Sequence, residues 1–260
     1  MTPWIDVHAH LEMLETQPLE TLKAAEEAGV VQLITIGCHP QDNRRVVEIA
    51  RAHHPKVFCT VGVHPHESLH WNDDIEKETR SFLSEPFVIG IGETGLDYYY
   101  DHSPREQQKT VFRRQMEIAQ EVGLPVEIHT REAEPDTVEI LKEYQGKVRG
   151  LIHCFTGTED LARKCLDLGY NISFSGVITF KNAEPLREIV KFVPLDRLHV
   201  ETDAPFLAPV PQRGKKNIPA FLVHTAQLVA ELKGVSPETL SQQVFKNVQN
   251  LFPRYRRWDA

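Results

Sequence analysis

Eight short apolar runs recur along the chain, and longer, more polar stretches separate them. Each run is rich in β-branched residues and is nearly continuous, rather than alternating, in its apolar positions. This pattern is typical of parallel strands that are covered on both faces. It predicts eight buried strands, within residues 4–10, 30–37, 57–66, 87–95, 124–131, 148–155, 170–176 and 197–205.

The stretches between and after these runs carry helix signals. Some repeat apolar positions every three residues, some begin with proline or with Ser-Pro-Glu, and two end at a glycine, which suits a helix C-terminus. The clearest predicted helices are residues 18–29, 104–123 and 236–252.

Strand and helix therefore alternate eight times in one chain. Eight such units in 260 residues match the size of an α/β protein of the (β/α)8 TIM-barrel type. A doubly wound open sheet is the alternative, but no Gly-x-Gly-x-x-Gly motif follows the first run. We find no linker and no low-complexity segment, so we predict a single domain over residues 1–260.

Composition narrows the class of protein. The chain is 41% hydrophobic but has no apolar run of about 18 residues, so no membrane span is expected. No basic-plus-apolar leader precedes the first run, and the four cysteines lack Cys-x-x-Cys spacing, which together predict a cytoplasmic protein without a disulfide scaffold. A formal net charge of −8 argues against a protein that coats nucleic acid, but not against an enzyme that uses metal ions on it.

Polar residues fall at the carboxyl ends of the predicted strands. In a barrel these ends converge on one face, where active sites lie. Six of the eight ends carry a residue type that binds metals, and the polar residues there are His8, His10, His64, His66, Glu93, His129, Arg131, His153, Glu201 and Asp203.

Imidazoles and carboxylates gathered in one pocket would be costly to bury without a cation. With divalent ions they become ligands, and the residue types suit Zn²⁺ or Mn²⁺, with Mg²⁺ also possible. About six ligands exceed one tetrahedral site and fit two ions bridged by a carboxylate. Glu93, which lies between the two groups of histidines and has glycines at 90, 92 and 95, is the predicted bridge.

Each of these signals also has an ordinary structural interpretation. A lone His-x-His is more often structural than not, His64 and His66 flank a proline and could shape a turn, and His153 alone would suit a buried core histidine. The coincidence at six strand ends favours a metal centre. No role is assigned to the seven other histidines, namely His39, His53, His54, His70, His102, His199 and His224.

Six motifs, in order along essentially the whole chain, resemble one known family. They are DVHAHL, GVHPH, GETGLDYY, IHTRE, IHCFTG and ETDAP. Together they are similar to the TatD family of metal-dependent deoxyribonucleases, within the amidohydrolase-like metallohydrolases. The resemblance implies a TIM barrel with two divalent ions, such as Mg²⁺, Mn²⁺ or Zn²⁺, and DNA as substrate.

Matched residue by residue, the resemblance implies a ligand set. One ion would be held by His8, His10, Glu93 and Asp203, and the second by Glu93, His129 and His153. His64 and Glu201 would support the ligands or face the substrate. Two positions depart from the family pattern: Ile218 stands where an acid is common, and Glu132 stands where aspartate is more frequent. Both departures concern substrate preference rather than the metal centre.

We therefore expect hydrolysis of DNA phosphodiester bonds by a metal-activated water, on single strands and from an end. Asp203 and Glu93 are the predicted catalytic residues, with Asp203 accepting a proton or orienting the nucleophile. Arg131 and the basic run 213–216 are candidates for flanking phosphates, although such runs are usually solvated loops. Tyr98 or Tyr99 could stack on a base or simply pack.

Two other functions stay open at this point. A related barrel enzyme could cleave an amide, a lactone or another ester, although many of those carry a carbamylated lysine where this chain has Glu93. A binding protein with structural metals is the other alternative, but structural zinc sites are closed and usually rich in cysteine. The sequence indicates no stable protein partner.

Overall fold

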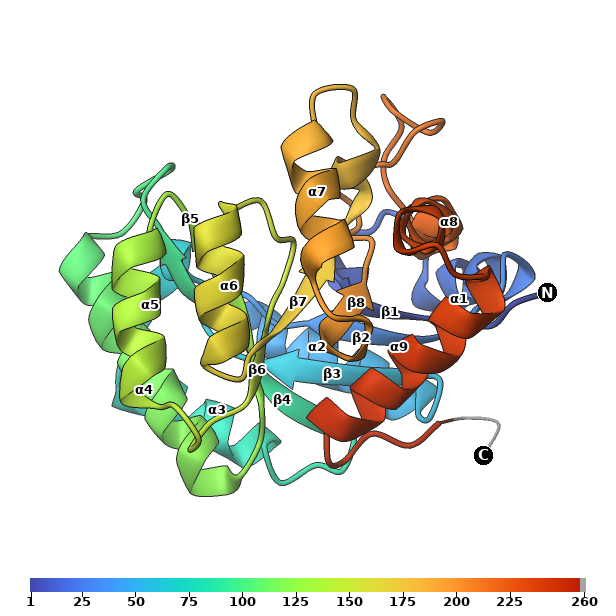
Figure 1. Ribbon diagram of the computed structural model, residues 1–260. Coiled ribbons are helices and arrows are strands. Elements are labelled where there is room, and N and C mark those ends of the chain that lie inside the picture. The colour runs from blue at the N-terminus through green and yellow to red at the C-terminus, as the bar shows by residue number, and fades with distance from the viewer. Residues whose placement is uncertain (258–260) are drawn as a thin grey trace.

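Eight parallel strands form the centre of the protein in the computed structural model, which describes residues 1–257 (Figure 1). Neighbours in the sheet follow the order of the chain from β1 to β8, and every recorded pair is parallel. The strands are β1 (Trp4–Ala9), β2 (Val30–Ile36), β3 (Val57–Val61), β4 (Val88–Asp97), β5 (Val126–Arg131), β6 (Gly150–Ile152), β7 (Asn171–Phe174) and β8 (Leu198–Val200).

The sheet closes between its first and last strands. Ala9 and Ala204 form a parallel bridge, the His10 amide donates to the Ala204 carbonyl at 2.8 Å, and the Asp203 amide donates to the His8 carbonyl at 2.9 Å. The predicted (β/α)8 barrel is therefore confirmed. The closing bonds involve three of the predicted site residues, so they also fix the backbone of the site.

Helices surround the strands, as Figure 1 shows, and cover their outer faces. The three clearest helix predictions are confirmed by α1, α4 and α9. The helices are α1 (Pro18–Glu27), α2 (Pro40–His53), α3 (Asp73–Phe82), α4 (Arg105–Val122), α5 (Glu134–Glu143), α6 (Glu159–Asp167), α7 (Glu184–Phe192), α8 (Leu222–Lys233) and α9 (Pro237–Leu251). Short 3₁₀ turns are η1 (Leu11–Met13), η2 (Pro65–His70), η3 (Gly176–Thr179), η4 (Leu195–Arg197) and η5 (Pro219–Phe221).

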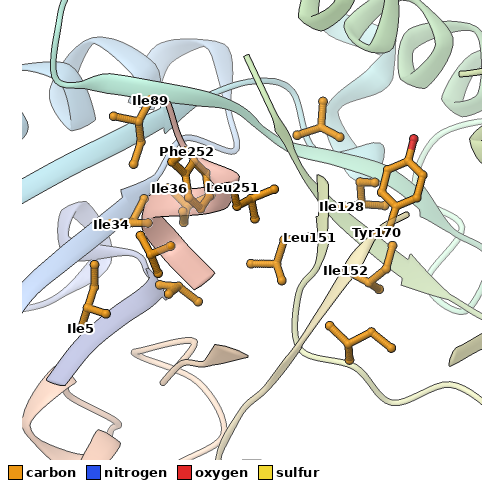
Figure 2. Packing of buried hydrophobic residues seen from close by; sticks show 14 of the residues in the cluster. Ile5, Ile34, Ile36, Ile89, Ile128, Leu151, Ile152, Tyr170, Leu251 and Phe252 are labelled. Atoms are coloured by element: carbon orange, nitrogen blue, oxygen red, sulfur yellow. The ribbon is translucent and has the colours of Figure 1, made fainter. Parts of the chain in front are cut away.

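One apolar core runs through the barrel, and the segment after α9 packs against it. Figure 2 shows Leu251 and Phe252 beside Ile36 and Ile89, and Phe252 is fully buried. Arg254 donates to the carbonyls of Leu83, Glu85 and Val88, from the end of α3 to the first residue of β4, which holds this segment in place. All four cysteines are free thiols, and among residues 1–257 no helix is both long and apolar enough to cross a membrane.

Glycines in β4 let this strand approach β5 closely. Gly92 has a φ of +159°, and a Cβ there would lie 2.8 Å from the Glu127 Cβ. Gly95 has a φ of +131°, and a Cβ there would lie 1.9 Å from the His129 carbonyl oxygen. Because no side chain fits at this distance, the two glycines set the spacing between Glu93 and the polar residues of β5.

Replacing Gly95 by alanine is expected to destabilise the fold strongly. The methyl group would collide with the β5 backbone, in a conformation that L-residues avoid, so we expect a loss of at least about 3 kcal/mol in the free energy of unfolding. Gly146→Ala is the matched control, because Gly146 has a φ of +73° but nothing within 4 Å of a Cβ. We expect about 1 kcal/mol there. Equal urea midpoints for the two variants would contradict the role given to Gly95.

Candidate metal centre

The carboxyl ends of the strands bring six predicted side chains together. His8 lies in β1 and His10 just after it, Glu93 lies in β4, His129 in β5, and His153 and Asp203 follow β6 and β8. All of these except the partly exposed His129 are buried. Six residues from five segments of the chain therefore share one small region inside the mouth of the barrel.

Glu93 occupies the middle of this cluster, and its two oxygens face different nitrogens. Oε2 lies 3.6 Å from His8 Nε2 and 3.9 Å from His10 Nε2. Oε1 lies 2.7 Å from His153 Nε2 and 3.1 Å from His129 Nδ1. The carboxylate thus stands between two separate sets of imidazoles, which is the arrangement that a bridging ligand requires.

The spacing on the Oε2 side fits one cation. The Nε2 atoms of His8 and His10 are 3.3 Å apart, and Asp203 Oδ1 lies 3.4 Å from His10 Nε2 and 3.8 Å from His8 Nε2. Two ligand atoms that each lie about 2.1 Å from an ion at a tetrahedral angle are about 3.4 Å apart. The three side chains are therefore spaced like neighbours in a coordination shell.

Carboxylates orient most of these imidazoles from behind. His8 Nδ1 lies 2.8 Å from Glu127 Oε2, and His129 Nε2 lies 2.9 Å from Asp97 Oδ2. Glu201 Oε1 lies 3.4 Å from His153 Nδ1 and accepts the Cys154 amide at 2.6 Å. A carboxylate on the ring nitrogen that faces away from the site is characteristic of histidines that bind metals.

Glu127 and Asp97 were not anticipated from the sequence. Glu127 precedes His129 by two residues on β5, so the two side chains share a face, and this alternation was the available signal. Asp97 ends β4 within the GETGLD motif. Cys38 was also missed: its Sγ lies 3.1 Å from Glu93 Oε2 and 3.6 Å from His10 Nδ1.

Charges within the cluster shift the pKa values of its members. Burial and the neighbouring His153 lower the pKa of His8, but hydrogen bonds with Glu127 and Glu93 outweigh them and raise it to about 9. Burial raises the pKa of Glu93, but His153, His64 and His129 hold it well below its usual range. These carboxylates therefore favour a positive charge at the imidazoles, and a divalent cation can supply that charge by displacing protons.

The other three predicted site residues differ in their distance from Glu93. His64 Nε2 lies 3.4 Å from Glu93 Oε1, and Glu201 lies behind His153 as described. Burial lowers the pKa of His64 to about 4, so it stays neutral, and its Nδ1 accepts the His66 amide. Its proton therefore sits on Nε2, which makes His64 a donor toward Glu93.

Arg131 lies at the rim, where its guanidinium stands over the rings of Tyr99 and Tyr100 at 4.0 and 4.9 Å. In the basic run, Arg213 lies over the Phe180 ring at 3.8 Å and Lys216 pairs with Glu15. The Tyr98 hydroxyl donates to Asp136 and its ring packs under Arg105. The Tyr99 ring also has an arginine on one face, but Tyr99 is exposed whereas Tyr98 is only partly so, which makes Tyr99 the better candidate for stacking.

Backbone strain gathers at the same end of the barrel. Among residues 1–257, the non-glycine residues with positive φ all lie in segments that follow strands, and they are Asp101, Glu132, Cys154, Asp203 and Leu207. Such conformations cost about 1 to 3 kcal/mol each and cluster at functional sites. Asp203, with a φ of 57°, is both strained and part of the cluster.

A second group of possible ligands lies outside the cluster. His39, Glu67 and His70 approach one another in the part of the chain that the structure describes, and all three are at least partly exposed. His39 Nδ1 accepts the Gln41 amide at 3.1 Å, which places the proton of a neutral His39 on Nε2, the nitrogen that faces Glu67. This tautomer suits a hydrogen bond better than metal binding.

Known proteins that are similar to this chain are described as metal-dependent hydrolases or DNases. The family model described as "TatD related DNase" matches residues 5–253. The uncharacterized metal-dependent hydrolase YcfH of Escherichia coli K12 is 40% identical over 255 residues, covering 95% of each chain. The protein YabD of Bacillus subtilis 168, also called an uncharacterized metal-dependent hydrolase, is 38% identical over 95% of this chain and 98% of its own.

A further relative carries a more specific name. The "3'-5' ssDNA/RNA exonuclease TatD" of Pantoea ananatis is 35% identical over 90% of this chain and 92% of its own. Among solved structures, YJJV, a TatD homolog from Escherichia coli K12, superposes with a TM-score of 0.90 at 26% identity, covering 96% of this chain and 98% of that one. Because the family model and these relatives all match nearly the whole chain, the chain belongs to the TatD-related DNase family.

Proposed function

We propose that this protein is a metal-dependent hydrolase that cleaves phosphodiester bonds in single-stranded DNA. The observation that carries the proposal is the position of Glu93, whose two oxygens face two sets of imidazole nitrogens. Two-ion centres of this kind suit in-line displacement at phosphorus. The names of the relatives, one of them an exonuclease on single-stranded DNA and RNA, support the same class of substrate.

The side chains divide into two ligand sets in this proposal. His8, His10, Asp203 and Glu93 would hold one ion, and Glu93, His129 and His153 would hold the other. When bound, the two divalent ions supply positive charge that polarises the phosphodiester and lowers the pKa of a nearby water.

Asp203 is the proposed proton acceptor. Burial raises its pKa, but His10, His8 and His153 outweigh this effect and keep the pKa below its usual value, so the carboxylate is ionised. Its Oδ1 faces His10 and His8, which leaves Oδ2 to take a proton from the attacking water. His64 carries its proton on Nε2 and is placed to donate to Glu93 or to a phosphate oxygen.

The direct test is an assay of nucleotide release from single-stranded DNA with Mg²⁺, Mn²⁺ or Zn²⁺. Amide, lactone and carboxylic ester substrates are assayed beside it. We expect metal-dependent release of nucleotides from DNA and no turnover of the amide, lactone or carboxylic ester substrates. Turnover of an amide or a lactone alone would contradict the proposal and favour the related hydrolases.

Removing Glu127 is expected to weaken metal binding without removing a ligand. Without its partner at Nδ1, His8 loses both its orientation and part of its basicity, so we expect Glu127→Ala to lower metal affinity by about 10- to 100-fold. Glu127→Gln is the matched control, because its amide oxygen still accepts from Nδ1. Titration with Mn²⁺, followed by calorimetry, measures the effect. Equal affinities in Glu127→Ala and the unsubstituted protein would contradict the proposed role of His8.

A further inference from the structure

Exposed apolar side chains gather around the mouth of the barrel. Large hydrophobic residues that remain exposed are few among residues 1–257, and most of them lie in segments that follow β1, β3, β4 and β8. These are Met13, Leu69, Tyr99, Tyr100, Phe206 and Val210. Exposed apolar side chains that gather around one opening, rather than lying singly, are candidates for a binding surface.

Two tyrosines and an arginine form the first part of this surface. The Arg131 guanidinium lies 4.0 Å from the centre of the Tyr99 ring and 4.9 Å from that of Tyr100, and both rings are about half exposed, at 53% and 51%. Asp97 Oδ1 accepts the amides of both tyrosines at 3.0 and 2.8 Å, while its Oδ2 contacts His129. One carboxylate therefore fixes the tyrosine turn relative to the metal cluster.

Arg131 has no anionic partner among the residues that the structure describes. Most arginines of this chain pair with a carboxylate or a carbonyl, but the Arg131 guanidinium has neither an ion pair nor a hydrogen bond recorded to residues 1–257. A cavity of 410 Å³ opens beside it, and its lining includes Thr130 and Thr156 as well as the carboxylates of Glu132 and Glu134. Glu134 accepts hydrogen bonds from Thr158 and not from Arg131. The partly buried guanidinium itself is unpaired, so it is free to accept a phosphate that approaches from the mouth of the barrel.

Phe206 forms the second part of the surface, on the other side of the metal cluster. Its ring is 51% exposed and lies edge-on to His10 at 6.0 Å. The Phe206 amide donates to the Asp203 carbonyl at 2.8 Å, and the buried Asn217 donates to the Phe206 carbonyl at 2.6 Å. The ring is thus carried on a backbone that is tied to a member of the cluster.

The strand order places the two parts opposite each other. Phe206 belongs to the junction of β8 and β1, whereas Tyr99 and Arg131 belong to that of β4 and β5. In a closed ring of eight strands in chain order these junctions lie half a turn apart. The metal cluster, with Glu93 at its centre, lies between them.

We propose that the two parts bind the nucleosides on either side of the scissile phosphate. One base stacks on Phe206, the other stacks on Tyr99, and the phosphate beyond that second base accepts hydrogen bonds from Arg131. This inference rests on the proposed nuclease function and deepens it, because it names the groups that recognise a nucleotide chain. Since the bases must leave a duplex to stack on protein rings, the substrate crosses the mouth as a single strand.

The formal charge of −8 supports a local mode of binding. A protein with this charge does not hold nucleic acid through a general basic surface. Stacking contributes affinity that is independent of charge and tolerant of sequence, because every base has a π-face. One arginine and two aromatic sites next to the cations therefore suffice to hold a short stretch of strand.

A mutant cycle between protein and substrate tests the proposal. The probe is a fluorescent single-stranded oligothymidylate of about ten nucleotides, long enough to fill both stacking sites. It is used intact or with one abasic residue on either side of the cleaved bond. The variants are Tyr99→Ala and Phe206→Ala, with Tyr99→Phe and Phe206→Tyr as controls that keep the ring. The cleavage assay uses Mn²⁺, and binding without turnover is followed by fluorescence anisotropy in Ca²⁺.

We expect each alanine variant to raise KM and weaken binding in Ca²⁺ by about 5- to 100-fold, while the controls change both by about twofold or less. An abasic residue on the matching side should weaken binding by a similar factor, and should add nothing further to the matching alanine variant. Equal KM values in all variants would refute the stacking sites. So would a loss of affinity from the abasic residue that is as large in the matching alanine variant as in the unsubstituted protein.

The same experiment separates this inference from the proposed function. If the unsubstituted protein cuts the intact oligonucleotide and the alanine variants have the same KM and the same affinity, the proposed nuclease function is supported and the stacking sites are refuted. The opposite result is that the unsubstituted protein binds the oligonucleotide in Ca²⁺ but does not cut it in Mn²⁺, while the alanine variants bind it weakly. That result would support the stacking sites and refute the proposed nuclease function.

Discussion

Glu93→Gln is expected to lower kcat on single-stranded DNA by about 10³-fold or more, because losing even about 4 kcal/mol of transition-state stabilisation corresponds to that factor. Glutamine has the same shape but only one oxygen and no charge. Its amide nitrogen cannot bind a cation, so one side of the bridge loses its ligand and both ions lose a shared negative charge. Metal analysis of the dialysed variant should find at most one tightly held ion.

Glu67→Gln is the matched control for this variant. It removes a carboxylate from the exposed group of His39, Glu67 and His70, which is separate from the proposed centre. We expect its metal content and kcat to equal those of the unsubstituted protein. Full activity in Glu93→Gln would show that a different residue joins the two sets of imidazoles.

Asp203→Asn has the second largest expected effect. The amide keeps an oxygen toward His10 and His8 but cannot accept a proton at the other position, so we expect kcat to fall by about 10²- to 10⁴-fold. Asparagine has nearly the same shape as aspartate, and the hydrogen bond that closes the barrel runs from the backbone N–H of residue 203 to the His8 carbonyl, so this bond remains. Thermal unfolding should therefore change little, which separates loss of chemistry from loss of fold.

A weakened metal site could also lower kcat in this variant, so the assay is repeated at rising Mn²⁺ concentrations. The expected deficit persists at saturation. Asp196→Asn, in the exposed turn η4 at the other end of β8, is the control and should behave as the unsubstituted protein. Complete rescue of Asp203→Asn by excess metal would assign Asp203 to metal binding alone.

The barrel and its cluster were predictable because both depend on periodic features of the sequence. Apolar runs at regular intervals indicated eight parallel strands, and the strand ends of a barrel must converge, so His8 and Asp203 could be placed together although they are far apart in the chain. The proximity of Glu93 to both sets of histidines followed from the same geometry. Their identity as metal ligands stays a prediction.

The residues that support this cluster were harder to predict. Glu127 is the second residue of β5, between Val126 and Ile128, and gives no signal except its alternation with His129. Asp97 and Cys38 contact the cluster only through the detailed packing of β4 against β5 and of the loop after β2. Such contacts depend on side-chain orientation rather than on the order of elements, so the sequence pattern does not specify them.

At the rim of the barrel, too, some residues could be placed from the sequence and others could not. Arg131 could be predicted to lie near the mouth, since it ends a strand that also carries His129. Its stacking on Tyr99 could not be predicted, because that contact depends on the turn that Asp97 fixes. Phe206 had no sequence signal at all beyond its position after Asp203.

Anomalous diffraction from crystals grown with Mn²⁺ tests the central claim most directly. Two peaks are expected inside the barrel mouth, about 3.5–4 Å apart, with Glu93 between them. One should lie against His8, His10 and Asp203, and the other against His129 and His153. A single peak, or peaks only at exposed residues such as His39 and His70, would contradict the two-ion centre and the hydrolysis proposed from it.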